Sequence, residues 1–174
     1  CGIAVFVPQY RRAPEHPFPA GLNDARAALA ALRTEAGEGP LIVGGDSAGA
    51  GIAPSLGAMA AAGHAPRIDA LTLLSPWLDL TVSAPSYAAN AASDALFSAE
   101  SAKVAADLYL QGADAAHPLA SPLFADCTGF PPTFISVGNG EVLRDDSLRF
   151  HARLAAASRP AELCTVPGMG HVAV

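Results

Sequence analysis

Short apolar runs that favour β-strands alternate with segments of helical periodicity along most of this chain. The apolar runs, bounded by glycine and proline, predict strands at residues 3–10, 41–46, 70–76, 133–138 and 162–167. Leucine and alanine at three- and four-residue spacing predict helices at residues 20–36, 47–62, 98–110 and 144–157. Strands that alternate with helices are typical of βαβ units, in which a parallel sheet is buried on both faces. The sequence therefore predicts an α/β fold with a mostly parallel sheet flanked by helices.

The composition is that of one globular domain. Hydrophobic residues make up 51% of the 174 residues and charged residues 15%, which supports a packed core and argues against disorder. A net charge of −6 and the lack of a basic patch argue against nucleic acid as a partner. No apolar run reaches the ~20 residues that a membrane span needs. The cysteines Cys1, Cys127 and Cys164 form no CxxC pair, so we expect no disulfide framework, no zinc or other metal site, and a cytoplasmic location.

One stretch interrupts the alternation of strands and helices. Residues 77–132 separate the third predicted strand from the fourth and contain one clear helical pattern, at 98–110. A connection of this length in a compact domain is usually a lid or a binding element. An ordinary crossover helix with irregular flanks is the alternative.

The strongest local motif is Gly45-Asp46-Ser47-Ala48-Gly49, which fits G-x-S-x-G and lies between a predicted strand and a predicted helix. This context is that of a nucleophile elbow, a strained turn that exposes a serine hydroxyl above a sheet. Glycine two residues before and after the serine avoids a collision across the turn. The backbone N–H of Ala48, at the helix start, is a candidate oxyanion donor. A plain glycine-rich turn is the alternative, whereas neither a dinucleotide-binding loop nor a P-loop fits the segment.

A nucleophilic serine needs a base and an acid, and in α/β-hydrolases the acid and then the histidine follow it along the chain. His171 lies in a glycine-rich loop after the last predicted strand, which makes it the expected base. The acid is expected in the loop after residues 133–138. Glu141 stands first in that loop and is favoured, with Asp145, at the start of the next helix, as the alternative. Surface or packing roles are expected for the other four histidines, His16, His64, His117 and His151.

Six segments together are similar to the motifs of one family: YRRAPEHPFPAGLND at 10–24, GDSAG at 45–49, SPWLDLT at 75–81, SPLFAD at 121–126, VGNGEVLRDD at 137–146 and PGMGH at 167–171. On these segments the chain resembles the hormone-sensitive-lipase-like (family IV) bacterial esterases of the α/β-hydrolase superfamily. The resemblance covers nearly the whole chain. It implies an α/β-hydrolase fold that hydrolyses short-chain carboxylic esters through an acyl-enzyme, with a small-molecule ester as partner and without a cofactor.

The resemblance also implies roles for particular residues: Ser47 as nucleophile, His171 as base and Glu141 as acid. Residues 1–174 would then be part of one catalytic domain, with 82–118 as a cap insertion over the site. Glu141 stands where most members carry Asp, and Arg12 where the family usually has Leu. The His-Gly-Gly-Gly loop, which supplies the second part of the oxyanion hole in this family, precedes the first residue here. We therefore expect N-terminal strands and this loop to be missing, and the chain, which begins at Cys1, to be a piece of a longer protein.

Three other interpretations compete with a carboxylesterase. An amidase or deacetylase uses the same triad, and a relative that binds small ligands without catalysis keeps the same fold. A fragment without its first strands has an exposed sheet edge, through which it could pair with a second copy as a homodimer or remain inactive.

Overall fold

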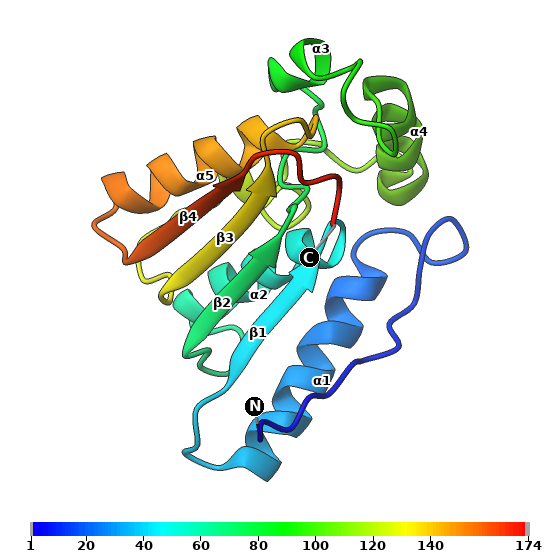
Figure 1. Cartoon of the computed structure of the whole chain (residues 1–174). Helices are drawn as coiled ribbons and strands as arrows, with labels where there is room; N and C mark the ends of the chain where they lie inside the picture. The colour runs from blue at the N-terminus through cyan, green and yellow to red at the C-terminus, as the bar shows by residue number, and fades with distance from the viewer. Residues whose placement is uncertain (1, 173–174) are drawn as a thin grey trace.

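Four parallel strands form the sheet in the computed structural model, which describes residues 2–172 (Figure 1). The strands are β1 (Ile42–Asp46), β2 (Ala70–Leu74), β3 (Thr133–Gly138) and β4 (Ala161–Val166), and they lie side by side in this order. Pairing is parallel throughout, with Ile42 opposite Ala70 and Thr133 opposite Ala161. The prediction of an α/β fold with a parallel sheet is confirmed, and all four strands end at the same edge.

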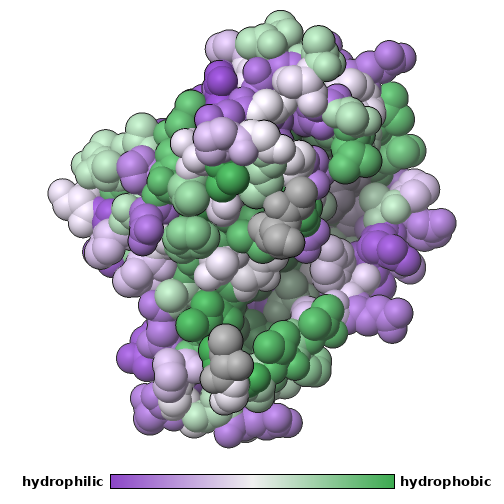
Figure 2. Space-filling view, in the orientation of Figure 1, coloured by the Kyte–Doolittle hydropathy of each residue, from purple (hydrophilic) through white to green (hydrophobic). Residues whose placement is uncertain are grey.

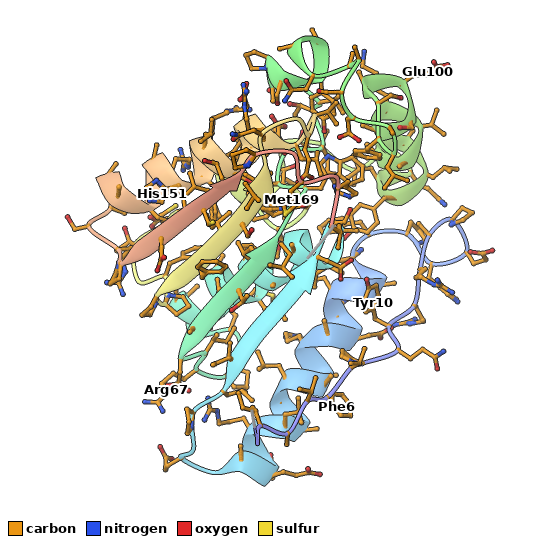
Figure 3. All side chains as sticks on the ribbon, in the orientation of Figure 1. Phe6, Tyr10, Arg67, Glu100, His151 and Met169 are labelled. Atoms are coloured by element: carbon orange, nitrogen blue, oxygen red, sulfur yellow. The ribbon has the colours of Figure 1, made fainter. Side chains whose placement is uncertain are left out.

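The strand predicted at residues 3–10 is wrong, because this segment forms no strand in the structure. Its apolar side chains are exposed, with Ile3 at 70% and Val5 and Val7 at 83% of their full accessibility. A strand needs a neighbour that completes its backbone hydrogen bonds, and this segment has none among residues 2–172. Figure 1 shows it as an extended trace beside α1 (Ala20–Ala36), and Figure 3 shows Phe6 on it.

Three helices cover one face of the sheet. Helix α2 (Gly49–Ala61) packs on β1 and β2, α5 (Arg144–Ala156) packs on β3 and β4, and α1 packs on α2. In Figure 1, α2 and α5 lie behind the strands, and the front of the sheet is free of helices among the described residues. Figure 2, in the same orientation, shows apolar surface on that front face. The main core lies between the sheet and these helices, and its largest buried side chains include Leu22, Leu71, Leu73, Ile135, Phe130 and Phe150.

The long connection between β2 and β3 lies beyond the carboxyl ends of the strands (Figure 1). Besides the predicted helix, which is α4 (Ala99–Leu110), it contains the short helix α3 (Ser86–Ala89) and a 3-10 turn, η1 (Pro122–Phe124). The Ser98 hydroxyl caps α4 by accepting from the Ser101 N–H at 3.1 Å. A second apolar cluster joins this connection to the end of the sheet and includes Trp77, Tyr87, Leu110 and Leu143. None of the helices within residues 2–172 is long and apolar enough to cross a membrane.

Candidate active site

Ser47 occupies the turn between β1 and α2 in the conformation that the motif predicts. Its φ is 49°, a left-handed value that is costly for a residue with a side chain. A Cβ on Gly45 would come within 2.4 Å of the carbonyl carbon of Gly49, so the turn requires a glycine there. The collision predicted for Gly49 is wrong, because a Cβ at that position would meet nothing within 4 Å. The Ser47 N–H donates to the carbonyl of Leu74 at 3.0 Å, and its carbonyl accepts from the Trp77 N–H at 3.2 Å. The turn is thus held against the end of β2, and the strain is balanced by backbone hydrogen bonds on both sides.

His171 lies between Ser47 and Glu141. Its Nε2 is 2.9 Å from the Ser47 Oγ, and its Nδ1 is 2.7 Å from the Glu141 Oε2. The three side chains come from the loops after β1, β3 and β4, which meet because parallel strands end at one edge. Figure 3 shows Met169, in the His171 loop, at this edge of the sheet. The structure therefore brings together the three residues favoured from the sequence.

The two candidate acids, Glu141 and Asp145, face different partners. Glu141 is buried, with 1% of its surface exposed, and its Oε1 accepts from the Gly138 N–H at 2.5 Å and from the Ser75 hydroxyl at 2.8 Å. Asp145 accepts from the Ser86 N–H at 2.9 Å and pairs with Arg144. Asp145 thus ties α5 to the connection between β2 and β3, and Glu141 is the acid that reaches the imidazole.

The remaining histidines lie outside this arrangement. His117 packs beside Phe18 and accepts from the Leu119 N–H at 3.1 Å. Figure 3 shows His151 on α5, well away from the loop that carries Met169. Within residues 2–172 no three His, Cys, Asp or Glu side chains gather as a metal site, and Cys1 lies outside the described residues.

Sequence reasoning missed two side chains that contact this arrangement. Ser75, the first residue after β2, bonds Glu141, and Phe97 stacks on His171 with ring centroids 6.0 Å apart and an interplanar angle of 12°. Trp77 meets Phe97 edge to face at 5.3 Å. Both Ser75 and Trp77 belong to the SPWLDLT segment at 75–81, which supports the resemblance but was assigned no role in the site. Phe97 lies in the segment before α4, whose sequence carries no signal of a contact with His171.

An apolar cavity of about 240 Å³ opens beside the start of α2. Ala48, the residue after Ser47, forms part of its wall, together with Gly51 and Ile52 of α2. Trp77, Leu80 and Tyr109 line it from the connection between β2 and β3, and Tyr10 to Ala13 close it from the N-terminal segment. Tyr10 points from that segment toward the end of β1 in Figure 3. The cavity can hold an apolar group of a ligand beside Ala48, the residue that follows Ser47.

Two buried carboxyl groups support the loop behind Trp77. Asp146 is fully buried, and its Oδ2 accepts from the N–H groups of Leu78 and Asp79 at 3.0 Å each. The pKa of Asp146 is raised to about 7. Burial is the main cause, and the nearby charge of Asp79 adds to it, whereas the backbone hydrogen bond from Leu78 lowers the pKa and only partly offsets the rise. The pKa of Asp79 is held below its ordinary value: burial opposes the shift, but hydrogen bonds from Ser83, Thr81 and Arg149 outweigh it. At neutral pH Asp79 therefore carries the charge that pairs with Arg149.

Replacing Asp146 with asparagine should change how stability depends on pH. A carboxyl with a pKa near 7 in the folded protein and near 4 in the unfolded chain binds more protons when folded between these values, so stability falls as pH rises through this window. The asparagine would keep an acceptor oxygen for the two N–H groups but would not ionise. As the pH rises from 4 to 8, we expect the free energy of unfolding of Asp146→Asn to increase relative to that of the wild type by on the order of 2–4 kcal/mol. Denaturant unfolding of both proteins across this range tests it, and parallel curves would contradict it.

Comparisons with known proteins cover the whole chain. A family model described as alpha/beta hydrolase fold matches residues 1–174. The chain is 40% identical over 173 residues to an acetyl-hydrolase of Streptomyces hygroscopicus, a match that covers 98% of this chain and 58% of that protein. It is 34% identical over 174 residues to carboxylesterase NlhH of Mycobacterium tuberculosis, covering 93% of this chain and 54% of that protein.

Solved structures give the same assignment. A hormone-sensitive lipase from a metagenome library matches with a TM-score of 0.90 and 40% identity, over 94% of this chain and 56% of that one. An esterase from the bacterial hormone-sensitive lipase family matches with a TM-score of 0.89 and 38% identity, again over 94% and 56%. The chain spans little more than half the length of these relatives. The resemblance to hormone-sensitive-lipase-like esterases is confirmed, and the chain belongs to the family of the alpha/beta hydrolase fold.

Proposed function

We propose that this chain carries the catalytic triad of a carboxylesterase, with Ser47 as nucleophile, His171 as general base and Glu141 as the acid. The proposal rests on two hydrogen bonds of the His171 imidazole. Its Nε2 lies 2.9 Å from the Ser47 Oγ, and its Nδ1 lies 2.7 Å from the Glu141 Oε2. A serine hydroxyl becomes nucleophilic when a base within hydrogen-bond reach accepts its proton. The names of the relatives, acetyl-hydrolase and carboxylesterase, support an ester as the substrate.

The reaction follows from these contacts. His171 Nε2 takes the Ser47 proton while the Oγ attacks the ester carbonyl carbon, and the tetrahedral intermediate collapses as the alcohol leaves with that proton. Water then attacks the acyl-serine with His171 again as base, which releases the carboxylic acid and restores the hydroxyl. Glu141, bonded to Nδ1, holds the imidazole with its Nε2 toward Ser47 and stabilises the imidazolium.

The oxyanion donor in this chain is the Ala48 N–H. A helix begins with N–H groups that have no partner within the helix, and α2 begins directly after Ala48. These groups and the helix dipole favour negative charge beside Ser47. The family that this chain resembles takes further donors from a glycine loop, and each such donor contributes about 10²–10³ in rate.

The cavity beside Ala48 suggests where the acyl group of the substrate binds. At about 240 Å³ the cavity has room for roughly eight groups the size of a water molecule, which occupies roughly 30 Å³ in the liquid and is close in size to a methylene group. A short acyl chain therefore fits inside it. Residues 82–118 would act as a cap, since α4 supplies Tyr109 to the cavity wall and Phe97 stacks on His171.

The test compares an ester with the matching amide in the intact protein. We expect hydrolysis of p-nitrophenyl butyrate, much slower hydrolysis of butyryl-p-nitroanilide, and loss of both after a fluorophosphonate inhibitor that modifies Ser47 alone. Mass spectrometry of the labelled peptide identifies the modified serine. Anilide hydrolysis as fast as ester hydrolysis would instead indicate an amidase. A folded protein that binds butyrate but never takes the label would indicate a ligand-binding relative.

A further inference from the structure

Ser75 occupies a strained and fully buried position behind the acid of the triad. It is the first residue after β2, its exposed fraction is 0%, and its φ is 46°. That left-handed conformation favours glycine, because it brings a Cβ close to the backbone. Its N–H donates to the Ser136 carbonyl at 2.7 Å, which continues the pairing of β2 with β3 past the strand end. Strain of this kind persists where surrounding contacts fix it, and it is a pointer to function.

The hydroxyl of Ser75 joins two loops that come together only in the folded chain. It donates to Glu141 Oε1 at 2.8 Å and accepts from the Val172 N–H at 3.1 Å. Val172 directly follows His171, so one oxygen contacts both the carboxylate of Glu141 and the N–H of the residue next to the base. A hydroxyl has one donor and two acceptor sites, and this arrangement uses both kinds. Among residues 2–172, no other side chain from outside these two loops forms hydrogen bonds with both of them.

We propose that Ser75 is a positioning residue of the triad, whose hydroxyl sets the rotamer of Glu141 and the place of the His171 loop. The proposal rests on the esterase function proposed above. A glutamate has one more rotatable bond than an aspartate, so its carboxylate needs more restraint to stay in the plane of the imidazole. Ser75 and Gly138 supply this restraint by donating to Oε1, which leaves Oε2 for Nδ1 of His171.

Two substitutions separate the hydroxyl from the backbone conformation. Ser75→Ala removes the hydroxyl and keeps a Cβ in the strained conformation, whereas Ser75→Gly removes the hydroxyl and relieves the strain. If the hydroxyl positions the triad, both variants lose kcat by roughly 10- to 100-fold, because small misplacements of catalytic groups cost rates of this size. KM changes less than about 3-fold, since Ser75 is not among the residues that line the cavity.

The matched control is Ser147→Ala. Ser147 is also a fully buried serine, and its hydroxyl has no hydrogen-bond partner among the described residues. Its substitution deletes the same atom from the interior of the molecule without touching either loop. We expect kcat and KM of this variant to match the wild type.

A second readout reports the geometry directly. The Nδ1 proton of an imidazole bonded to a carboxylate gives a strongly downfield proton signal, which we expect in the wild type and in Ser147→Ala. The signal should move upfield or vanish by exchange in both Ser75 variants. A Ser75→Gly variant with wild-type kcat and an unmoved signal would overturn the proposal and leave Ser75 a backbone role only. If the wild type hydrolyses no ester, the signal still decides whether Ser75 positions the pair, so failure of the esterase proposal is distinguishable.

Discussion

Ser47→Ala is expected to abolish ester hydrolysis, with kcat lower by about 10⁴-fold or more. The variant keeps the imidazole and the acid but offers His171 no proton to take, so no acyl-enzyme forms. The residual rate then comes only from substrate binding and from the N–H groups at the start of α2. Steady-state hydrolysis of p-nitrophenyl butyrate measures the loss, and the absence of a burst of p-nitrophenol in the first turnover confirms that acylation is the missing step.

A second variant, Ser47→Gly, tests whether a loss of activity in Ser47→Ala comes from misfolding. The backbone at Ser47 is left-handed, with φ at 49°, so alanine keeps the strain there and glycine relieves it. Ser47→Gly should therefore be at least as stable as Ser47→Ala and equally inactive. Thermal unfolding of both variants beside the wild type checks the fold. Unchanged turnover in either folded variant would refute Ser47 as the nucleophile.

The strand predictions succeeded where burial decides the local sequence. Strands β2 and β3 lie in the middle of a parallel sheet, so their residues form short apolar runs that are readable without the structure. Residues 3–10 carry the same kind of run but form no strand, because pairing depends on a neighbour elsewhere in the molecule. Local pattern therefore predicts the tendency to form a strand, and only three-dimensional context decides whether it is realised.

In the candidate site, too, local sequence predicts some features and three-dimensional context decides the others. The motif around Ser47 is local: two glycines and a strand-to-helix turn are legible in five residues. Ser75 and Glu141 are 66 residues apart, and their contact depends on the alignment of β2 with β3, which no short motif encodes. Glu141 and Asp145 are close in sequence, but a helix start between them turns their side chains toward different partners. From the sequence, Glu141 was favoured because it stands first in the loop. The structure adds the physical reason, which is that the Glu141 carboxylate faces His171 whereas the Asp145 carboxylate faces Ser86.

Glu141→Gln is expected to lower kcat by about 10⁴-fold, although glutamine has nearly the same size and shape. The carboxylate of Glu141 meets three donors: the Gly138 N–H and the Ser75 hydroxyl at Oε1, and the His171 Nδ1–H at Oε2. Only a carboxylate accepts at both ends, whereas a glutamine accepts at one and donates at the other.

Either orientation of the glutamine side chain is therefore wrong. With its NH₂ group toward Gly138, two N–H donors face each other at the position where the structure now has a 2.5 Å hydrogen bond. With its NH₂ group toward His171, the imidazole must carry its proton on Nε2, which then cannot accept the proton of Ser47. The loss should be seen in kcat rather than in KM, because Glu141 acts on the substrate only through the imidazole.

Asp145→Asn is the matched comparison, since it makes the same kind of change four residues later in the chain. Asp145 accepts from the Ser86 N–H and pairs with Arg144, and it has no contact with His171. Asparagine retains an acceptor for Ser86, so we expect kcat within a few-fold of the wild type and a modest loss of stability, about 1 kcal/mol. Measuring kcat for both variants on p-nitrophenyl butyrate decides between the two acids. An inactive Asp145→Asn beside an active Glu141→Gln would reverse the assignment, and would require the loop after β3 to rearrange so that Asp145 replaces Glu141 against Nδ1.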